Sequence, residues 1–359
     1  MRRDILEIDT ALSAAVHRPE LNVADVEAIR LLLVGGSVVD WQRLNFKSRS
    51  EVDRQLGLLE LDMDDPDDVD RLRYVFNESV SYLEEHLHLQ FPRELRNPED
   101  VRDVFLWASQ WGGFRRTQIL SCVILKLMHV IHHMEAADLK FKTAISEERF
   151  LEMAHRRILR AAREMQDSGL PVSSFYGSRK SRSSVITKLL AKSDTLAATI
   201  FDHLRFRVVV QHQEDLGPTL AWMTHNMFPF NYVIPGQSHN NLLDPATLLA
   251  GLTGDDLEIA RQSAPPAMTG GGKNEFSGQS YRTINFIVDY PVKIPETHQS
   301  AVSFELGKVV FVMVEFQLLD EETARTNEEG DNAHVLYKQR QHLEVAKRLK
   351  RGGAQRRNE

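Results

Sequence analysis

The sequence predicts an α+β protein in which an all-helical N-terminal domain precedes a mixed β-sheet flanked by helices. Residues 1–168 carry helix signals without an alternating strand pattern, whereas β-branched runs typical of strands occur in the second half. The length of 359 residues agrees with about two domains. We therefore expect a helical domain over residues 1–168, a sheet domain over residues 169–340, and a basic C-terminal helix and tail over residues 341–359.

The composition narrows the class of protein. Hydrophobic residues make up 42% and charged residues 26% of the chain, as is usual for a globular protein. The single cysteine, Cys122, excludes an internal disulfide and Cys-based zinc clusters. The N-terminus lacks an apolar leader and no run of 18 apolar residues follows, so we interpret the protein as cytoplasmic, without a membrane partner. A net charge of -7 with local basic patches favours phosphate binding over duplex DNA binding.

Capping signals and apolar periodicity locate helices in the first half. Ser48–Glu51 has the spacing of a capping box, and Asn97–Pro98 places an N-cap before a first-turn proline. A long apolar helix is expected from about Thr117 to Lys140, because apolar residues recur on one broad face. A charged helix is expected from about Ser146 to Gln166.

The second half alternates helices and strands after the break near Gly169–Pro171. The expected elements, in order, are a basic helix over 182–192, a strand over 204–210, a helix over 216–227, a short strand over 232–234, a loop over 251–280, strands over 281–290 and 308–319, and a helix from about 321 that stops near Gly352.

A set of basic and hydroxyl side chains starts the second half. Lys180, Ser184 and Lys188 are spaced i, i+4, i+8, which places them on one helix face, with Arg179 and Lys192 close by. Such a row of cations is costly unless an anion lies against it, and polyphosphate suits that role. A solvent-facing basic helix is the alternative.

Two acids far apart in the chain occupy strand positions. Asp202 opens the strand that carries Arg205 and Arg207, so its carboxylate could hold a hard cation while the arginines bind phosphate. Glu315 lies inside an apolar strand, where a carboxylate needs a partner, a metal or a proton. Two carboxylates on neighbouring strands would suit Mg²⁺ binding and deprotonation of a hydroxyl.

Three histidines on the long helix offer a competing site. His129, His132 and His133 fall within one arc of the helix, so two of them could bind one metal ion. The same pattern suits the polar side of a helix packed under the second domain. We favour this structural interpretation over a metal-dependent hydrolase.

Taken in order, the motifs resemble the synthetase domain of RelA/SpoT-type alarmone enzymes and their toxin relatives, a nucleotidyltransferase-type fold. The resemblance spans about residues 175–340. The matching pieces are Gly177–Lys180 with Ser184 and Lys188, Asp202–Arg207, Tyr281–Asn285, Glu315–Gln317, and His334 with Tyr337 and Lys338. No His–Asp pair similar to the family's hydrolase is present in the sequence.

The resemblance implies a role for each matching residue. Arg179, Lys180, Ser184, Lys188, Arg207 and Gln317 would bind ATP; Tyr281, Asn285, His334 and Lys338 would bind the acceptor; Asp202 and Glu315 would bind Mg²⁺ and form the catalytic pair. The chain departs from the family pattern at Ser178, which replaces an arginine, at Arg205, which replaces a glycine, and at Asn285, which replaces a histidine.

The favoured hypothesis is therefore a Mg²⁺-dependent pyrophosphokinase of the stringent response, which transfers pyrophosphate from ATP to the 3′-hydroxyl of GDP or GTP. Pyrophosphorylation of tRNA 3′ ends is one alternative, and a non-catalytic nucleotide-binding module is another. The sequence leaves open the acceptor, the role of the helical half and the oligomeric state, which could be a homo-oligomer.

Overall fold

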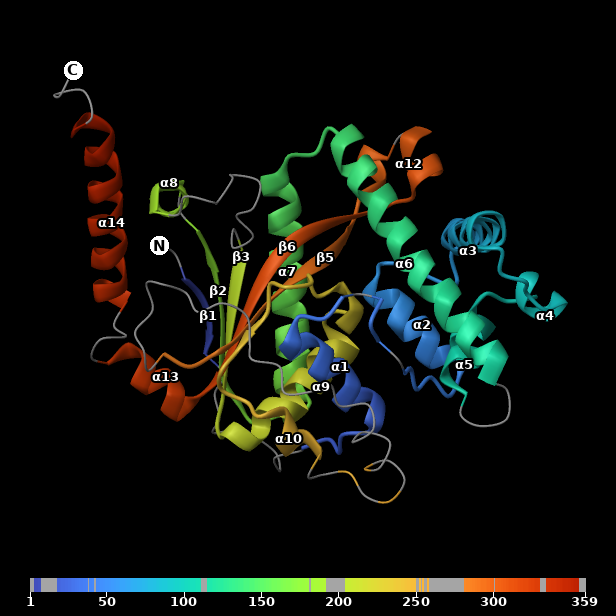
Figure 1. The fold of residues 1–359 in the computed structure, drawn as a ribbon, viewed down its shortest axis with the longest axis horizontal. Helices are drawn as coiled ribbons and strands as arrows, with labels where there is room; N and C mark the ends of the chain where they lie inside the picture. Colours follow the sequence, from blue (N-terminus) through green and yellow to red (C-terminus); the bar gives the residue numbers. More distant parts are fainter. Residues whose placement is uncertain are drawn as a thin grey trace.

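A six-stranded mixed β-sheet with helices packed around it forms the centre of the protein in the computed structural model (Figure 1). The structure describes residues 3–7, 18–37, 39–41, 43–110, 115–180, 182–191, 204–249, 252, 254, 257, 281–299, 301–329 and 334–354. The mixed sheet and its flanking helices confirm the predicted α+β class.

The sheet has the strand order β1-β2-β3-β6-β5-β4. Its strands are β1 (Arg3–Glu7), β2 (Val172–Arg179), β3 (Leu204–Val210), β4 (His239–Asn240), β5 (Ile284–Lys293) and β6 (Val309–Asp320). β3 and β6 pair in parallel, and the other neighbours pair antiparallel. The two longest strands, β5 and β6, thus lie next to each other inside the sheet, where their apolar residues are buried on both faces.

Helices account for most of the first half of the chain. The helices before β2 are α1 (Val23–Val34), α2 (Arg49–Leu58), α3 (Pro66–Leu87), α4 (Arg93–Arg96), α5 (Arg102–Ser109), α6 (Arg115–Lys142) and α7 (Glu147–Asp167). Those after β2 are α8 (Arg182–Ala191), α9 (Leu216–Asn226), α10 (Pro245–Leu248), α12 (Ala301–Leu306), α13 (Glu321–Glu328) and α14 (His334–Ala354), with 3₁₀ turns η3 (Gln213–Asp215), η4 (Phe230–Tyr232) and η6 (Glu296–His298). In Figure 1, α2 to α6 lie to the right of the sheet and α14 lies beside α8 on the left.

One face of the sheet is apolar and carries a row of aromatic rings. Phe175, Phe206, Phe316 and Phe286 come from four neighbouring strands, and successive ring centroids are 5.5, 5.7 and 5.7 Å apart. The imidazole of His155 on α7 stacks on Phe206 at 5.6 Å. Burying these rings ties the sheet to α7 and leaves the opposite face for polar side chains.

Two hydrophobic cores divide the helices. The first contains the sheet with α1, α7 and α9, whereas the second is formed by α2, α3, α5 and part of α6. α6 contributes Leu139 to the first core and Ile124 to the second. The helices of the first half thus pack partly on the sheet, and the domain boundary at residues 168–169 stays a prediction.

The N-terminal domain is not all-helical, which corrects the prediction. Residues Arg3–Glu7 form β1 and pair antiparallel with β2. An uncovered β2 would present unpaired N–H and C=O groups at the sheet edge, and β1 satisfies them. The sequence analysis also missed β2, whose first residue follows Pro171 by one position.

The expected helices of the middle region are largely confirmed. α6, α7, α8 and α9 begin and end within a few residues of the predicted bounds, as do β3 and β6. Ser48 is the N-cap of α2, and its hydroxyl accepts a hydrogen bond from Glu51 N, as predicted. The Glu51 carboxylate accepts from Lys47 N and not from Ser48 N, so the second hydrogen bond of the predicted capping box is wrong. Most of the expected loop over 251–280 lies outside the described residues.

Three other local predictions are wrong. The helix expected after Asn97–Pro98 begins only at Arg102, because the Asp100 carboxylate accepts from Arg102 N and from its guanidinium, which holds a turn in front of the helix. Residues 232–234 form the end of η4 and an isolated bridge at Val233 rather than a strand. The C-terminal helix is divided into α13 and α14, and α14 continues through Gly352 to Ala354.

Residues Arg116–Lys142 of α6 have the length and hydropathy of a bilayer-spanning helix. A core helix of a soluble protein meets the same criterion, since it is also long and apolar. α6 packs against α5, α3 and β6, and the two cores bury part of its apolar residues, whereas Ile119, Met134 and Phe141 are exposed.

Candidate functional site

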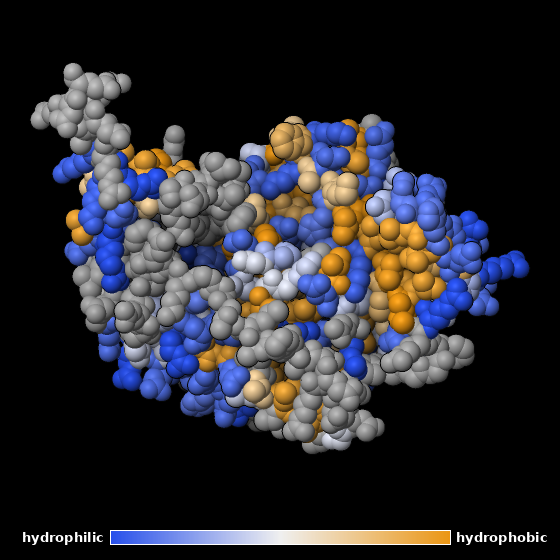
Figure 2. Space-filling view, in the orientation of Figure 1, coloured by the Kyte–Doolittle hydropathy of each residue, from blue (hydrophilic) through white to orange (hydrophobic). Residues whose placement is uncertain are grey.

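Two cross-strand rows of mostly polar side chains lie on the face of the sheet opposite the phenylalanines. Residues two apart on a strand point to the same face, so the strand register aligns these rows. The first row runs Ser178, Arg205, Glu315, Ile287, and the second runs Tyr176, Arg207, Gln317, Asn285, His239. We call these two rows the polar face. In Figure 2, hydrophilic residues line a hollow between α14 and the middle of the sheet.

Glu315 is paired with Arg205 across the β3–β6 ladder. The Arg205 Nε donates to Glu315 Oε2 at 2.7 Å, and the Glu315 side chain is 5% exposed whereas that of Arg205 is 38% exposed. A buried carboxylate requires a compensating partner, and here an arginine supplies it. The sequence analysis expected a partner, a metal or a proton for Glu315. The structure shows a partner, Arg205.

Arg207 lies in the second row and is oriented by two neighbours. Its Nη2 donates to Gln317 Oε1 at 3.4 Å, and its guanidinium lies 5.6 Å from the centre of the Tyr176 ring. The exposed carboxylate of Glu328 is 3.8 Å from Nη1. A guanidinium has five N–H donors, so these contacts leave it able to bind phosphate oxygens.

Tyr281 lies over the polar face, just before β5. Burial raises the pKa of the Tyr281 phenol, while the charges of Arg207 and Arg205 lower it and that of Glu315 raises it. The backbone carbonyl of Tyr281 accepts from Asn241 Nδ2 at 2.8 Å, which anchors this segment to the residue after β4. An aromatic ring is therefore held within electrostatic reach of the two arginines and the buried carboxylate.

Asn285 has an unsatisfied acceptor on the polar face. Its Oδ1 is buried and has no hydrogen-bond partner among the described residues. Buried side-chain oxygens usually have a partner. An N–H group of a bound molecule would provide one.

Five predicted site residues thus meet on one face: Glu315, Arg207, Gln317, Tyr281 and Asn285. The sequence analysis missed Tyr176 entirely because it missed β2. It expected Arg205 to bind phosphate together with Arg207 and noted it as a departure from the family pattern, but it did not predict the pairing of Arg205 with Glu315. The sequence does contain a signal for Tyr176. Phe175 and Tyr176 are adjacent, so in a strand their side chains point to opposite faces, one apolar and one polar.

Arg179 does not join this face. Its Nη1 lies 3.5 Å from Glu148 Oε1 on α7, which packs on the opposite side of the sheet. Successive side chains on a strand point to opposite faces, so an arginine displaced from position 178 to 179 changes sides. Ser178 stands on the polar face in its place.

The remaining basic residues belong to the edge formed by α8 and α14. Lys180 precedes α8, which begins at Arg182, so the prediction that Lys180, Ser184 and Lys188 share one helix face is wrong. Ser184 is half-buried on α8, and Lys338 Nζ donates to Gln341 Oε1 at 3.5 Å within α14. α14 packs on α8, where Arg348 Nη1 donates to Leu190 O.

Three predicted residues cannot be placed in the site. Asp202 lies outside the described residues, as do the side chains of Lys188 and His334. Their assigned roles stay predictions.

The described residues fit a magnesium ion only in part. Glu315 supplies a carboxylate of the kind that Mg²⁺ binds, but Arg205 holds one of its oxygens. Within the described ranges, no group of three or more His, Cys, Asp or Glu residues is placed to hold a metal. A magnesium site would therefore need Asp202 or substrate phosphates to complete it.

The histidines of α6 are packed as neutral rings. His133 stacks between Tyr232 and Phe311 at 4.9 and 4.5 Å, and His132 Nδ1 lies 3.0 Å from the Tyr232 hydroxyl. Burial lowers the pKa of His129 to about 2 and that of His132 to about 3. This packing agrees with the structural interpretation of the three histidines.

No protein-family model matches the sequence, and no curated protein matches it significantly. Among solved structures, the chain is similar to small alarmone synthetase 1 from Bacillus subtilis, with 16% identity, a TM-score of 0.31, and 58% of this chain and 97% of that chain covered. The structure of that synthetase bound to its product pppGpp matches with 18% identity and a TM-score of 0.30, over 56% of this chain and 90% of that chain.

The chain is also similar to a GTP pyrophosphokinase family protein from Streptococcus pneumoniae, with 14% identity, a TM-score of 0.28, and 60% and 95% coverage. These structures carry the names of the group that the sequence motifs resemble. At such TM-scores the likenesses carry no argument of their own, so the proposal below depends on the residues of this chain.

Proposed function

We propose that the protein is a Mg²⁺-dependent pyrophosphokinase that transfers pyrophosphate from ATP to the 3′-hydroxyl of GDP or GTP. The observation that carries this proposal is the polar face, where Arg205 and Arg207 flank the buried carboxylate of Glu315. Arg207 and Glu315 are also residues that match the synthetase motifs in the sequence.

The two arginines supply the charge that a triphosphate requires. Guanidinium groups bind phosphate oxygens through charge-assisted, often bidentate hydrogen bonds. Arg205 and Arg207 are adjacent on one side of β3, so one polyphosphate can contact both. Lys180 and Lys188, at the edge of the sheet, would add charge if they turn toward the same phosphates.

The aromatic and amide groups suit the nucleotide bases. Tyr176 and Tyr281 present rings beside the arginines, and base stacking on an aromatic ring contributes about 1–3 kcal/mol. The unsatisfied Oδ1 of Asn285 can accept a hydrogen bond from a base N–H. Guanine carries such donors at N1 and N2, so the base of a guanine nucleotide can provide this hydrogen bond.

The chemistry follows from this placement. The acceptor 3′-oxygen forms a bond to the β-phosphorus of ATP, the bond from that phosphorus to the oxygen that bridges the α- and β-phosphates breaks, and AMP leaves with that oxygen. The hydroxyl proton passes to the Glu315 carboxylate, which Arg205 keeps in position. The arginines stabilise the charge on the transferred phosphates, so catalysis depends on alignment and electrostatics. A bound Mg²⁺, held by Asp202 and Glu315, would supply further charge neutralisation.

The deciding experiment is a turnover assay with a panel of acceptors. Purified protein is incubated with labelled ATP and Mg²⁺ together with GDP, GTP or deacylated tRNA, and AMP formation is measured. We expect AMP with GDP or GTP. A Glu315→Gln variant should lose at least about 100-fold in rate, the usual effect of removing a general base. Glu322→Gln, an exposed acid on α13, is the matched control and should keep full activity.

Each alternative predicts a different result. AMP formation with tRNA alone would indicate the toxin-like activity, for which the basic residues of α14 would provide a binding surface. Saturable ATP binding that persists in Glu315→Gln, with no turnover in the unmutated protein, would identify a non-catalytic nucleotide-binding module. No AMP with any acceptor, and no ATP binding, would refute the proposal.

A further inference from the structure

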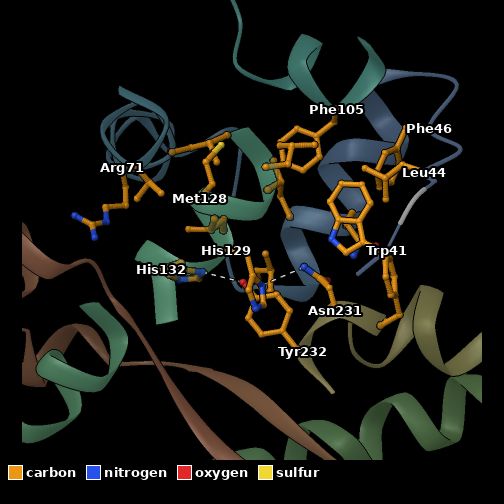
Figure 3. A pocket seen from close by; sticks show the side chains of 18 residues that line it. Trp41, Leu44, Phe46, Arg71, Phe105, Met128, His129, His132, Asn231 and Tyr232 are labelled. Carbon is orange, nitrogen blue, oxygen red and sulfur yellow. Dashed lines mark hydrogen bonds between the residues drawn. The ribbon is translucent and has the colours of Figure 1, made fainter. Parts of the chain in front are cut away.

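A cavity lies on the far side of α6 from the sheet. It is partly open to solvent and is lined by α2, α3, α5, α6 and η4 together with Trp41, Leu44 and Phe46, and its volume is about 90 Å³ (Figure 3). One water molecule needs only about 10–15 Å³ of such space. The cavity is therefore large enough for a small organic molecule.

The cavity wall is mostly apolar. Its lining includes Leu44, Phe46, Leu72, Phe105 and Met128 from the second hydrophobic core. Apolar cavities of this kind stay poorly hydrated and bind small apolar molecules. An occupant must therefore present mainly carbon to these residues.

Apart from Gln55 and Trp41, the polar side chains that line the cavity have partners. Asn231 Nδ2 donates to His129 Nδ1 at 3.1 Å, and the Tyr232 hydroxyl lies 3.0 Å from His132 Nδ1. Arg71, which is the charged side chain among the described lining residues, is paired with Glu135. Both histidines are neutral because burial lowers the pKa of each well below 6. A charged occupant would find no unpaired counter-charge on this wall.

Trp41 carries a buried donor on this wall. Its indole is 3% exposed, and Nε1 is buried without a hydrogen-bond partner among the described residues. Lys126 lies 4.9 Å from the ring centre and Phe230 packs edge-on at 6.5 Å, so the ring is held from two sides. Figure 3 shows the Trp41 indole among the side chains that line the cavity. A buried donor without an acceptor costs free energy that a bound oxygen atom would recover.

We infer that this cavity is a binding site for a small neutral aromatic molecule that carries one hydroxyl or carbonyl oxygen. The ring occupies the apolar part, and the oxygen accepts the hydrogen bond of Trp41 Nε1. The site is distinct from the polar face, because none of the residues of the two polar rows lines the cavity. The inference thus stands independently of the proposed function.

Phenol and toluene form a matched pair of probes, since they have the same size and differ in the oxygen. We expect phenol to bind the full-length protein saturably in calorimetric or ligand-observed NMR titrations. Trp41→Phe should weaken phenol binding about fivefold, the value of one hydrogen bond, and leave toluene binding within about twofold. Trp107→Phe, in the same core but outside the cavity lining, should change neither affinity.

A second measurement covers the case in which Trp41→Phe does not fold. The chain has 4 tryptophans, so its indole N–H resonances are few. Phenol should move one indole resonance saturably downfield while the others stay in place. The inference is overturned if phenol does not bind, if all indole resonances move alike, or if Trp41→Phe weakens phenol and toluene binding equally.

Discussion

Replacing Arg205 by methionine removes the cation that pairs with the buried Glu315 carboxylate and keeps most of the aliphatic side chain. Removing one partner of a fully buried ion pair lowers the free energy of unfolding by about 3–5 kcal/mol, because the other charge stays buried without compensation. Glu315 is 5% exposed, but Arg205 is 38% exposed, so water screens part of this interaction. We therefore expect Arg205→Met to lower the free energy of unfolding by about 1.5–3 kcal/mol.

A double-mutant cycle isolates the pair from other effects of each substitution. Glu315→Gln keeps the shape of the side chain and one hydrogen-bond acceptor while removing the charge. The free energy of unfolding of the two single variants and the double variant is measured by urea denaturation. The coupling energy should be about 1–2 kcal/mol, since the double variant no longer contains a buried uncompensated charge.

The second row of the polar face provides a matched control. Arg207 and Gln317 occupy equivalent positions on the same two strands, but Gln317 is neutral and the distance is 3.4 Å. The cycle built from Arg207→Met and Gln317→Leu should give a coupling energy below about 0.5 kcal/mol. Equal coupling in the two rows, or none between Arg205 and Glu315, would refute the view that Arg205 compensates the charge of Glu315.

Two further predictions concern stability. The folded state keeps His129, His132 and His133 neutral, with pKa values of about 2, 3 and 4, so the unfolded chain binds more protons below pH 6.5 and stability falls on acidification. Burial also raises the pKa of Asp289, which lies 3.5 Å from His133, to about 6, and this opposes the effect of one histidine. The free energy of unfolding should therefore fall near pH 5 by on the order of 2 kcal/mol per pH unit. His132→Phe should reduce this slope, measured by urea denaturation at a series of pH values, and an unchanged slope would contradict the assignment. Gly177→Ala should lower the free energy of unfolding by about 1–3 kcal/mol, because a Cβ would lie 2.7 Å from Phe206 Cε1 and 3.0 Å from His155 Nε2. Gly57→Ala, on α2 with open space around the added carbon, should instead stabilise the protein by about 0.5–1 kcal/mol, and a similar loss in both variants would contradict the packing explanation.

Local periodicity and capping signals explain which parts of the fold were predictable. The apolar pattern of α6 and the β-branched run of β3 are properties of neighbouring residues, and both elements appear where the pattern placed them. β2 was missed because Val172–Arg179 contains serines and a glycine that weaken its strand signal. Its strand conformation depends on pairing with β1 and β3. The turn before α5 was missed because Asp100 competes with Asn97 for the role of a helix start.

The candidate site was likewise predictable only where it depends on neighbouring residues of the chain. The sequence identified Arg205 and Arg207 as alternating residues of one strand and Glu315 as a carboxylate inside another, apolar strand. The partner of Glu315 could not be deduced, because Arg205 lies 110 residues away and only the parallel register of β3 and β6 brings them together. The sequence analysis was also wrong to place Arg179 with the ATP-binding residues, for a related reason. Its side depends on where β2 enters the sheet.

The amino-acid order alone determined the class of the fold, the motifs of the second half and the presence of a carboxylate in an apolar strand, because these are patterns over a few adjacent residues. The tertiary structure decided that this carboxylate pairs with an arginine, that the tyrosines and Asn285 lie beside it, and that the histidines of α6 are packed and neutral. Those outcomes depend on strand register and on burial, which arise only when distant segments of the chain pack together.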